Sequence, residues 1–390
     1  MIILHAIVSL DPAAGGPPQV AYRLAQAQAS LGHEVHLASY AGDAACQKRL
    51  QVEIRSNTTA GTVALHELSR PSRSELLFGW SARALFRELM PKVDVLHLHG
   101  VWESILRVGA SEARRSGKPY VVAPHGMLDP WSLGQKKLKK QFALAMGYRS
   151  MVEGAAFVHC LNSDEERLLS PLHLGCRTRT IPNGIFVDDF AHLPAEGTFR
   201  RLHPEVGDDP FVLFLSRLHH KKGLDYLADA FGLLSAKLPS ARLVVIGPDN
   251  GALADFQERI RAANLVERTH VLGPLYGADK MAALADAAVF CLPSRQEGFS
   301  IAILEAMACG VPLVLSENCH FPEVASAGAG YVVPLRAIDL ADALFEVVSD
   351  STNGGRMGEC GRELVRRDYL WPAIARLSID SYAQTLPTNR

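Results

Sequence analysis

The chain has 390 residues, of which 48% are hydrophobic and 21% charged, as is typical of a globular protein large enough for two domains. Its 40 basic and 41 acidic side chains nearly cancel, and the net charge of −1 gives no support to a nucleic-acid-binding role. The seven cysteines form no CxxC pair, so the sequence predicts neither a zinc site nor a disulfide framework and favours a cytoplasmic protein. The chain also lacks a run of about 18 apolar residues that could span a membrane.

The first half of the chain alternates short apolar runs with helical patterns. The turn at 11–18 contains Gly15 and Gly16 and leads through two prolines into a helix, and Ser163 to Glu166 reads as a capping box that opens a later one. Such alternation predicts a parallel sheet with helices on both faces. Strands are predicted at 1–9, 33–39, 93–99, 120–124, 155–161 and, with a turn, 179–184.

The second half repeats this alternation after a polar segment that contains proline and glycine. We therefore expect an N-terminal domain over 1–187, a linker over 188–209 and a C-terminal domain over 210–371, both domains being doubly wound α/β units. A last helix over 372–388 is expected to pack back on the first domain. Strands are predicted at 211–215, 241–246, 269–272, 288–292, 312–315 and 330–333, and helices at 224–237, 253–264, 279–287, 299–309 and 339–349.

Two glutamates frame the start of one predicted helix in the second half. Glu297 follows an apolar strand, and Glu305 lies two turns further on if the helix starts near Glu297. The free amides of Gly298, Phe299 and Ser300 would carry the positive end of the helix dipole. This pattern predicts a place for a phosphate between two hydrogen-bond acceptors, although a solvent-facing glutamate before an ordinary helix fits equally well.

Other polar groups follow strands of the same predicted sheet. Arg217 and Lys222 come directly after the strand at 211–215 and could clamp a diphosphate, or form a solvated turn. Glycine-containing loops that could contact a nucleobase follow the next two strands. Since ligands of open α/β sheets bind at the carboxyl ends of the strands, the convergence of these loops favours a site over four unrelated turns.

In the first half, two predicted strands end in histidines that precede glycines, at His97–His99 and at His125. A single histidine at such a place is more often structural, but two at one sheet edge favour a site. Asp129 and Trp131 follow directly and could shape an acceptor pocket. No HxxxH or DxD arrangement predicts a metal, and the two cations with the helix amides could stabilise a departing diphosphate without Mg²⁺.

The segment Lys136–Lys140 carries four lysines, with Leu138, Phe142 and Met146 among its apolar neighbours. Two interpretations remain open for it. One is a solvated helix face, and the other is contact with an anionic membrane surface or a lipid-diphosphate acceptor.

Taken together, these residues resemble the retaining family-four glycosyltransferases of the GT-B fold (glycosyl transferases group 1) over essentially the whole length. The resemblance rests most on Glu297, Glu305 and the Ala-Met-Ala-Cys-Gly-Val-Pro sequence that follows, supported by the spacing of Arg217 and Lys222, by Pro182-Asn-Gly-Ile185 and by the Gly-Gly loop. The sequence of residues 124–131, Pro-His-Gly-Met-Leu-Asp-Pro-Trp, further resembles that of family members that build bacterial exopolysaccharide or lipid-linked glycans. Ser300 departs from the pattern, because many relatives carry glycine there.

The resemblance implies two Rossmann-like domains that face each other across a cleft. It makes Glu297 a ligand of the donor sugar and Glu305 of the ribose, Arg217 and Lys222 ligands of the diphosphate, and His125 an active-site residue near the sugar. The resemblance therefore implies four catalytic residues, which are His125, Arg217, Lys222 and Glu297. Further donor-binding positions are Gly15, Gly16, Asn183, Leu275, Gly298, Phe299, Ser300 and Ile301, and acceptor positions are His99, Asp129 and Trp131.

The expected activity is thus metal-independent, retaining transfer from a UDP- or GDP-linked sugar to a glycan or lipid-linked acceptor, without a cofactor. Exopolysaccharide, capsule or lipopolysaccharide synthesis at the inner face of the membrane would fit it. A non-catalytic sugar-nucleotide-binding protein is one alternative, and a phosphorylase or an epimerase of the same fold is another. An NAD-dependent dehydrogenase is disfavoured because the first turn lacks GxGxxG.

Overall fold

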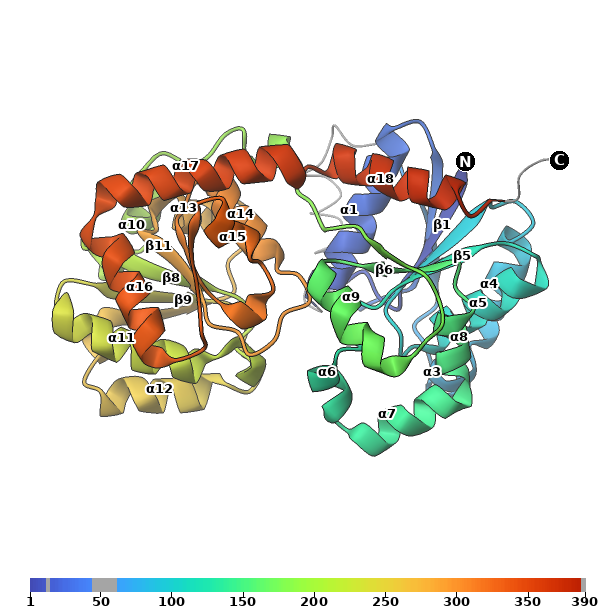
Figure 1. The fold of residues 1–390 in the computed structure, drawn as a ribbon, viewed down its shortest axis with the longest axis horizontal. Coiled ribbons are helices and arrows are strands. Elements are labelled where there is room, and N and C mark those ends of the chain that lie inside the picture. Colours follow the sequence, from blue (N-terminus) through green and yellow to red (C-terminus); the bar gives the residue numbers. More distant parts are fainter. Residues whose placement is uncertain (12–14, 44–61, 387–390) are drawn as a thin grey trace. The chain divides into compact units, whose positions relative to one another are not determined.

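The computed structural model describes residues 1–11, 15–43 and 62–386. It divides into two compact units, one of Met1–Gly184 with Trp371–Arg390 and the other of Ile185–Leu370 (Figure 1). The parts of the predicted turn at 12–14 and of the predicted last helix at 387–388, as well as Cys46, lie outside the described residues.

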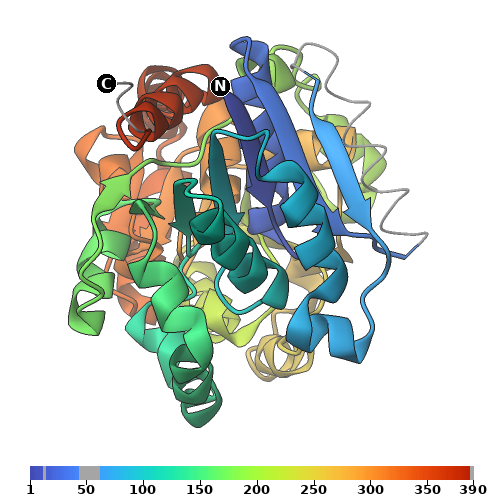
Figure 2. The same cartoon turned by 90° about the vertical axis from the view of Figure 1, so that its right-hand side faces the viewer.

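The first unit is built on a seven-stranded sheet in which every strand pairs in parallel, in the order β3-β2-β1-β4-β5-β6-β7. Figure 2 shows β3 at the edge of this sheet. Strand β3 was not predicted, because its five residues alternate between exposed and partly exposed and lack an apolar pattern. The strands are β1 Ile2–Ala6, β2 Glu34–Tyr40, β3 Ala64–Leu68, β4 Val95–His99, β5 Tyr120–Ala123, β6 Phe157–Cys160 and β7 Thr178–Thr180.

Helices cover both faces of this sheet. Helix α1 starts at Gly16 with prolines in its first turn, as expected from the sequence, and α18 at the end of the chain packs against it (Figure 1). The helices of the unit are α1 Gly16–Ser30, α3 Arg73–Phe78, α4 Trp80–Leu89, α5 Ser104–Arg115, α6 Pro130–Gly134, α7 Lys137–Ala143, α8 Arg149–Glu153, α9 Ser163–Leu169 and α18 Trp371–Ala383, with a π-helical turn η2 at Leu144–Tyr148.

The two faces of the first sheet differ in chemistry. Leu4, Leu96, Leu98, Val122 and Val158 alternate along the strands and belong to a continuous apolar core. The intervening positions of the same strands carry four buried histidines, and this face meets α1 and α18. The four histidines are His5 on β1, His97 and His99 on β4, and His159 on β6.

The second unit contains a six-stranded parallel sheet in the order β10-β9-β8-β11-β12-β13. Its strands are β8 Phe211–Leu215, β9 Arg242–Ile246, β10 Thr269–Gly273, β11 Val289–Leu292, β12 Leu313–Ser316 and β13 Gly330–Val333. Its helices are α10 Thr198–Leu202, α11 Leu224–Lys237, α12 Leu253–Ala262, α13 Gly277–Asp286, α14 Ile301–Cys309, α15 Glu323–Ser326, α16 Ala337–Ser349 and α17 Ser351–Asp368. These strands and most of these helices agree with the sequence prediction to within two residues.

The structure corrects the predicted linker at 188–209. This segment is part of the second unit, because Phe199 and Val206 are fully buried in its core. The carboxylate of Asp286 accepts hydrogen bonds from the amides of Gly197 and Phe199, at 2.7 and 2.9 Å, and so fixes the start of α10. The polar composition of residues 188–209 reflects short turns within the second unit rather than a connection between domains.

Two helix starts also differ from prediction. Helix α14 begins at Ile301 with Ser300 as its N-cap, so Glu297 lies four residues before the helix and not at its mouth. Helix α9 is capped by Asn162, whose side chain accepts from the amide of Glu165 at 2.7 Å, and not by Ser163. The carboxylate of Glu165 instead accepts from the amides of Gly126 and Leu161.

Candidate functional site

The strand order of the second unit reverses direction between β8 and β11, which lie next to each other at the centre of the sheet. Ligands of doubly wound sheets bind outside the carboxyl ends of the strands at such a switch point. The loop after β8 contains Arg217 and Lys222, and the loop after β11 contains Glu297. The topology therefore brings three of the four residues predicted as catalytic to one place.

Lys222 and Glu297 form an ion pair that joins the two loops. The Lys222 ammonium donates to Oε1 of Glu297, and the Ser294 hydroxyl donates to the same oxygen at 2.6 Å. Lys222 is 7% exposed and Glu297 6%, so the pair is almost completely removed from water. A buried charge must be paired, since leaving it alone costs several kcal/mol, on the order of 3–5.

A glycine permits the close approach of the two loops. Gly223 follows Lys222 with φ 69°, and a Cβ there would lie 1.8 Å from the carbonyl oxygen of Pro293 after β11. The amide of Arg295 also donates to the carbonyl of Lys221 at 2.7 Å. Gly223 is therefore required both for its left-handed backbone and for the space that a side chain would occupy.

The charges around the pair favour an ionised carboxylate. Burial by itself would raise the pKa of the Glu297 carboxyl, but the charges of Lys222 and Lys221 and the hydrogen bond from Ser294 outweigh burial and lower that pKa. Among the described residues, the guanidinium of Arg217 has neither a hydrogen-bond nor an ion-pair partner. Burial and the neighbouring cations, Lys221 and Arg217 first among them, lower the pKa of His219, which is the response expected in a positive environment.

Glu305 lies on α14 and is paired as well. Its carboxylate accepts from the ammonium of Lys280 on α13 at 2.7 Å, and its side chain is mostly buried. Lys280 was missed in the sequence, where it reads as an ordinary exposed residue of an amphipathic helix.

The other residues of this unit that were predicted to bind the nucleotide sugar lie just before α14, at its start or after β10. Phe299 packs its ring against Phe321 and Tyr369, with centroids 5.1 and 5.9 Å apart, and anchors the loop. Gly298 and Phe299 belong to this loop, Ser300 caps α14, and Ile301 is its first residue, which corrects the prediction that the free amides of the helix begin at Gly298. Leu275 is partly buried beside the core after β10.

In the first unit, His125 follows β5 and is held from two directions. Its Nε2 lies 3.1 Å from Nδ1 of His99, and its backbone has a left-handed φ of 53°. The carboxylate of Glu165 accepts from the amides of Gly126 and Leu161, both at 2.6 Å, and thereby fixes the loop. Burial raises the pKa of Glu165 to about 7, although those two amides oppose the rise. Glu165 was missed because it lies inside the predicted capping box of Ser163 and Glu166, where it reads as an ordinary residue of the first helical turn.

His99 has both ring nitrogens in contact with other histidines, because its Nε2 lies 2.9 Å from Nδ1 of His5. Neither ring nitrogen of His99 is therefore left to bind the acceptor substrate, although His99 was predicted as an acceptor position. Burial lowers the pKa of His5 and of His159 to about 4 and that of His125 to about 3, and it lowers the pKa of His97 and His99 well below the usual value. The cluster is therefore neutral at physiological pH.

Unsatisfied polar groups lie near the ends of β4 and β5. Among the described residues, Nε1 of Trp102 and Oε2 of Glu103 are buried without a hydrogen-bond partner, and burial raises the pKa of Glu103. The ammonium of Lys140 lies 5.5 Å from the Trp102 ring centre and donates to the carbonyl of Ser132 at 2.6 Å. Trp102 and Glu103 were not predicted from the sequence, although both lie within three residues of Gly100.

Asp129 and Trp131 form the start of α6. The Asp129 carboxylate accepts from the amide of Ser132 at 2.5 Å and so acts as the N-cap of this helix. Trp131 is partly buried. Of the other predicted positions, Gly15 caps α1 with φ 110°, Gly16 begins that helix, and Asn183 is buried with an Oδ1 that lacks a partner in the described part of the chain.

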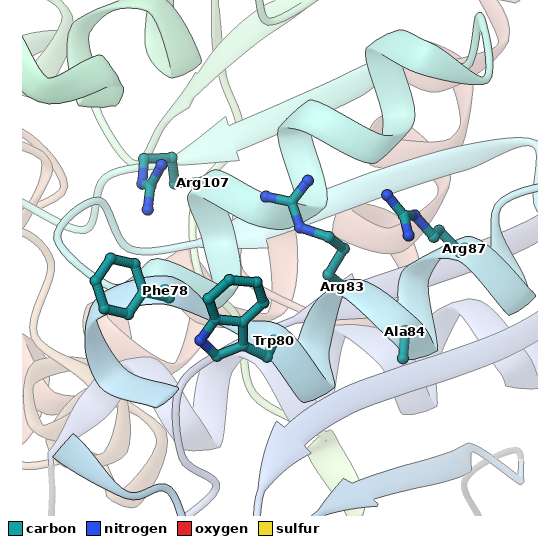
Figure 3. A pocket seen from close by; sticks show the side chains of 6 residues that line it. All are labelled: Phe78, Trp80, Arg83, Ala84, Arg87 and Arg107. Atoms are coloured by element: carbon teal, nitrogen blue, oxygen red, sulfur yellow. The ribbon is translucent and has the colours of Figure 1, made fainter. Parts of the chain in front are cut away.

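A pocket of about 480 Å³ lies elsewhere on the first unit, over α3, α4 and α5. Figure 3 shows the rings of Phe78 and Trp80 next to each other, with their centroids 5.7 Å apart, and guanidinium groups beside them. None of its residues belongs to the predicted site. The lining residues are Phe78, Trp80, Arg83, Ala84, Arg87 and Arg107.

Comparison with known families agrees with this division of the chain. Residues 15–184 match the family described as Glycosyl transferase 4-like domain, and residues 196–364 match Glycosyl transferases group 1. The chain belongs to the group 1 glycosyltransferases. Its two Rossmann-like units are those of the GT-B fold.

Relatives and solved structures extend this result. A phosphatidyl-myo-inositol mannosyltransferase of Mycobacterium leprae is 34% identical over 220 residues, which is 55% of this chain and 56% of that protein. A GDP-mannose-dependent alpha-(1-6)-phosphatidylinositol monomannoside mannosyltransferase of Mycobacterium tuberculosis is 27% identical over 331 residues, 81% and 83% of the two chains. The chain spans about half the length of the first curated relatives that it matches.

The Anabaena protein HepE, solved in complex with UDP and glucose, superposes with a TM-score of 0.79. The match covers 98% of this chain and 100% of HepE at 19% identity, so it establishes the fold alone. Among the described helices, none combines the length and the hydropathy needed to cross a bilayer.

Proposed function

We propose that this protein transfers a sugar from a nucleoside-diphosphate sugar to a hydroxyl group of a glycan or lipid-linked acceptor, with retention of configuration and without a metal ion. The observation that carries the proposal is the buried pair of Lys222 and Glu297 at the switch point of the second sheet, with Lys222 on the same loop as Arg217, whose guanidinium has no partner among the described residues. Family membership supplies the reaction class, and this arrangement supplies the groups that the reaction needs.

The charges fit the parts of a nucleotide sugar. When the bond between the anomeric carbon and the diphosphate breaks, negative charge develops on the leaving diphosphate. The oxygen of the acceptor hydroxyl forms the new bond to that carbon, and its proton passes to the departing diphosphate. Arg217 and Lys222 can stabilise this charge as fixed cations, so that a Mg²⁺ ion is not required. Glu297 would accept hydrogen bonds from sugar hydroxyls, and Glu305 from the ribose.

The relatives leave two donors open. HepE has been solved with UDP and glucose, whereas the mycobacterial relative is named for its dependence on GDP-mannose. Both donors present the same diphosphate to Arg217 and Lys222. The loop around Leu275 is the place where we expect the two bases to be distinguished.

The role of Lys222 can be tested by its replacement with methionine. We expect Lys222→Met to lower kcat by about a hundredfold or more, because a fixed charge that opposes the developing negative charge is lost. Turnover of UDP- and GDP-sugars, measured as release of the nucleoside diphosphate, gives the result. Lys237→Met, which removes an exposed lysine of the same unit, is the matched control and should leave kcat unchanged.

Since Lys222→Met leaves Glu297 buried without its partner, the variant could be inactive merely because it unfolds. The double variant Lys222→Met/Glu297→Gln removes both charges and keeps the hydrogen bond from Ser294, so it should regain thermal stability without regaining turnover. Near-normal turnover in a folded variant of either kind would refute the assigned role. A wild-type protein that binds a nucleotide sugar but never transfers it would favour the non-catalytic alternative.

For the acceptor we propose the corner of the first unit that contains Trp102, Glu103, Asp129 and Trp131. Nε1 of Trp102 can donate and Oε2 of Glu103 can accept, and neither of these two atoms has a hydrogen-bond partner in the described chain. Buried polar groups without partners are rare, because each costs on the order of 1–3 kcal/mol. A sugar hydroxyl would satisfy both groups, next to an aromatic surface on which a sugar ring can pack.

This acceptor site predicts a specific kinetic change in Glu103→Gln. The amide keeps the shape of the carboxyl but presents a different pattern of donors and acceptors, so we expect KM for the acceptor to rise by roughly tenfold while KM for the donor stays constant. Glu153→Gln, an exposed change in the same unit, serves as the control. Equal effects on both KM values, or none, would place the acceptor elsewhere.

We further propose that the first unit contacts an anionic membrane surface, where a lipid-linked acceptor would reside. Leu138, Phe142 and Met146 are 82%, 68% and 59% exposed and lie among the lysines of the 136–140 segment. The pocket in Figure 3 adds the exposed rings of Phe78 and Trp80 with nearby arginines, and Arg107 joins the two areas by donating to the carbonyl of Leu77 and lying over the Tyr148 ring. Apolar groups within a basic surface suit anionic lipid headgroups.

Co-sedimentation with vesicles tests this contact. We expect binding to vesicles that contain phosphatidylglycerol and little binding to pure phosphatidylcholine, with a loss of at least about fivefold in the variant Lys137→Ser/Leu138→Ser/Phe142→Ser. Substitution of the exposed Leu233 of the second unit by serine is the control. Equal binding to both kinds of vesicle, or unchanged binding by the triple variant, would contradict the contact.

A further inference from the structure

The buried histidines of the first unit form one continuous chain of hydrogen bonds that ends at His125. The chain runs from the carbonyl of Ile181 through His159, His97 and Tyr382 to Gln28, and from Gln28 through His5 and His99 to His125. Each contact spans 2.7–3.3 Å. Since a neutral imidazole has one donor and one acceptor nitrogen, a group that can only accept, placed at one end of the chain, determines the protons of the rings joined to it.

One such group is the carbonyl oxygen of Ile181, which can only accept. It lies 2.7 Å from Nε2 of His159, so the proton of His159 is on Nε2 and its Nδ1 accepts from Nε2 of His97, at 3.3 Å. Nδ1 of His97 must then accept from the hydroxyl of Tyr382, at 2.7 Å. The oxygen of Tyr382 therefore needs a donor, and Gln28 is its neighbour.

Gln28 transmits the assignment to the second part of the chain. Its Nε2 lies 3.2 Å from the Tyr382 hydroxyl and 2.9 Å from the hydroxyl of Ser378, whose own proton goes to the carbonyl of Ala375. Both hydroxyl oxygens can therefore only accept, and the NH₂ group of the Gln28 amide must face them as the donor. Its Oε1 must face His5, whose Nε2 lies 2.7 Å away and donates to it.

The remaining protons follow directly. With its proton on Nε2, His5 accepts at Nδ1 from Nε2 of His99, at 2.9 Å, and His99 accepts at Nδ1 from Nε2 of His125, at 3.1 Å. The proton of His125 is consequently on Nε2, inside the cluster. Its other nitrogen, Nδ1, carries a lone pair and has no hydrogen-bond partner in the described chain.

We propose that Gln28, His5 and His99 are positioning residues that keep His125 in the Nε2-protonated form, so that its Nδ1 acts as an acceptor for a substrate hydroxyl. The inference rests on the proposed function only for the role of that hydroxyl, because the proton assignment concerns the protein alone. The last helix of the chain takes part, since Ser378 and Tyr382 of α18 set the orientation of the Gln28 amide.

A metal site is the competing interpretation of the same cluster. His5, His97 and His99 present ring nitrogens within 4.8 Å of one another, a spacing at which three imidazoles can hold an ion. In the geometry described here, however, the nitrogens of these rings are occupied by the hydrogen bonds of the chain, and a proton lies between His5 and His99. The two interpretations make opposite predictions about bound metal.

The proton positions can be measured by NMR. In a long-range ¹H–¹⁵N correlation spectrum of protein labelled with ¹⁵N-histidine, protonated and unprotonated ring nitrogens resonate in separate ranges, and His125→Asn assigns the signals of His125. We expect a protonated Nε2 and an unprotonated Nδ1 for His125 in the wild type. A proton on Nδ1, or an imidazolium at pH 7, would overturn the proposal, as would a stoichiometric transition metal found by elemental analysis.

Two variants separate positioning from packing. Gln28→Leu removes the acceptor that faces His5, so the signals of His125 should become a mixture of both tautomers, and kcat should fall by roughly tenfold to a hundredfold. Tyr382→Phe removes another buried polar group of the chain but leaves Ser378 to orient Gln28. It should lower thermal stability while the tautomer of His125 and kcat stay unchanged.

The matched control is Gln26→Leu, at a buried glutamine of the same helix whose Oε1 has no partner among the described residues. An unchanged His125 spectrum in Gln28→Leu, or equal spectral changes in Gln28→Leu and Tyr382→Phe, would refute the positioning role. The spectra do not depend on turnover. If they agree with the proposal while no sugar is transferred, the proposed function fails and the proton assignment stands.

Discussion

The buried ion pair between Lys222 and Glu297 is the interaction that joins the two loops of the candidate donor site. It forms because the strand order places β8 beside β11 and because Gly223 lets one loop touch the backbone of the other. Two charges removed from water rarely stabilise a fold more than apolar side chains of the same size would. Their presence at the switch point, on loops that also carry a guanidinium without a partner in the described chain, is better explained by a ligand with negative charge and hydroxyl groups.

The buried polar network of the first unit consists of neutral groups. One face of its sheet holds an apolar core, whereas the other replaces part of that core with histidines joined by hydrogen bonds to α1 and α18. A buried polar network is stable only if its groups are satisfied. Here the carbonyl of Ile181 fixes the protons of His159 and His97, and the carbonyl of Ala375, through Ser378 and Gln28, fixes those of His5, His99 and His125. The result is a rigid support for one side chain, His125, whose outer nitrogen remains available.

Much of this arrangement was predictable from the sequence. Parallel alternation requires that loops after the strands share one edge, so the strand pattern alone assigns Arg217, Lys222 and Glu297 to one site. Their pairing could not be predicted, because it depends on which loops are neighbours. The start of α14 was misplaced by two residues, since Gly298 and Phe299 are as compatible with a helix as with the loop that Phe299 anchors on Phe321 and Tyr369.

The histidine chain was largely hidden from sequence analysis. His5 and His159 lie inside apolar strand patterns, and Gln28 lies on the helix face that the pattern assigns to packing. The contact between Gln28 and Ser378 joins residues that are 350 positions apart, and no local signal marks it. Trp102 and Glu103 were missed for another reason, because a buried group without a partner can be recognised only when its surroundings are known.

Nucleotide binding in the presence of EDTA shows whether the second unit holds a diphosphate without a metal ion. Thermal unfolding should be followed with UDP, GDP, ADP, CMP and NAD, each with and without the chelator. We expect one nucleoside diphosphate, UDP or GDP, to raise the unfolding temperature to the same extent in both conditions, since a ligand of the folded state stabilises it by mass action. Stabilisation by NAD alone, by none of the nucleotides, or only without EDTA would contradict this expectation.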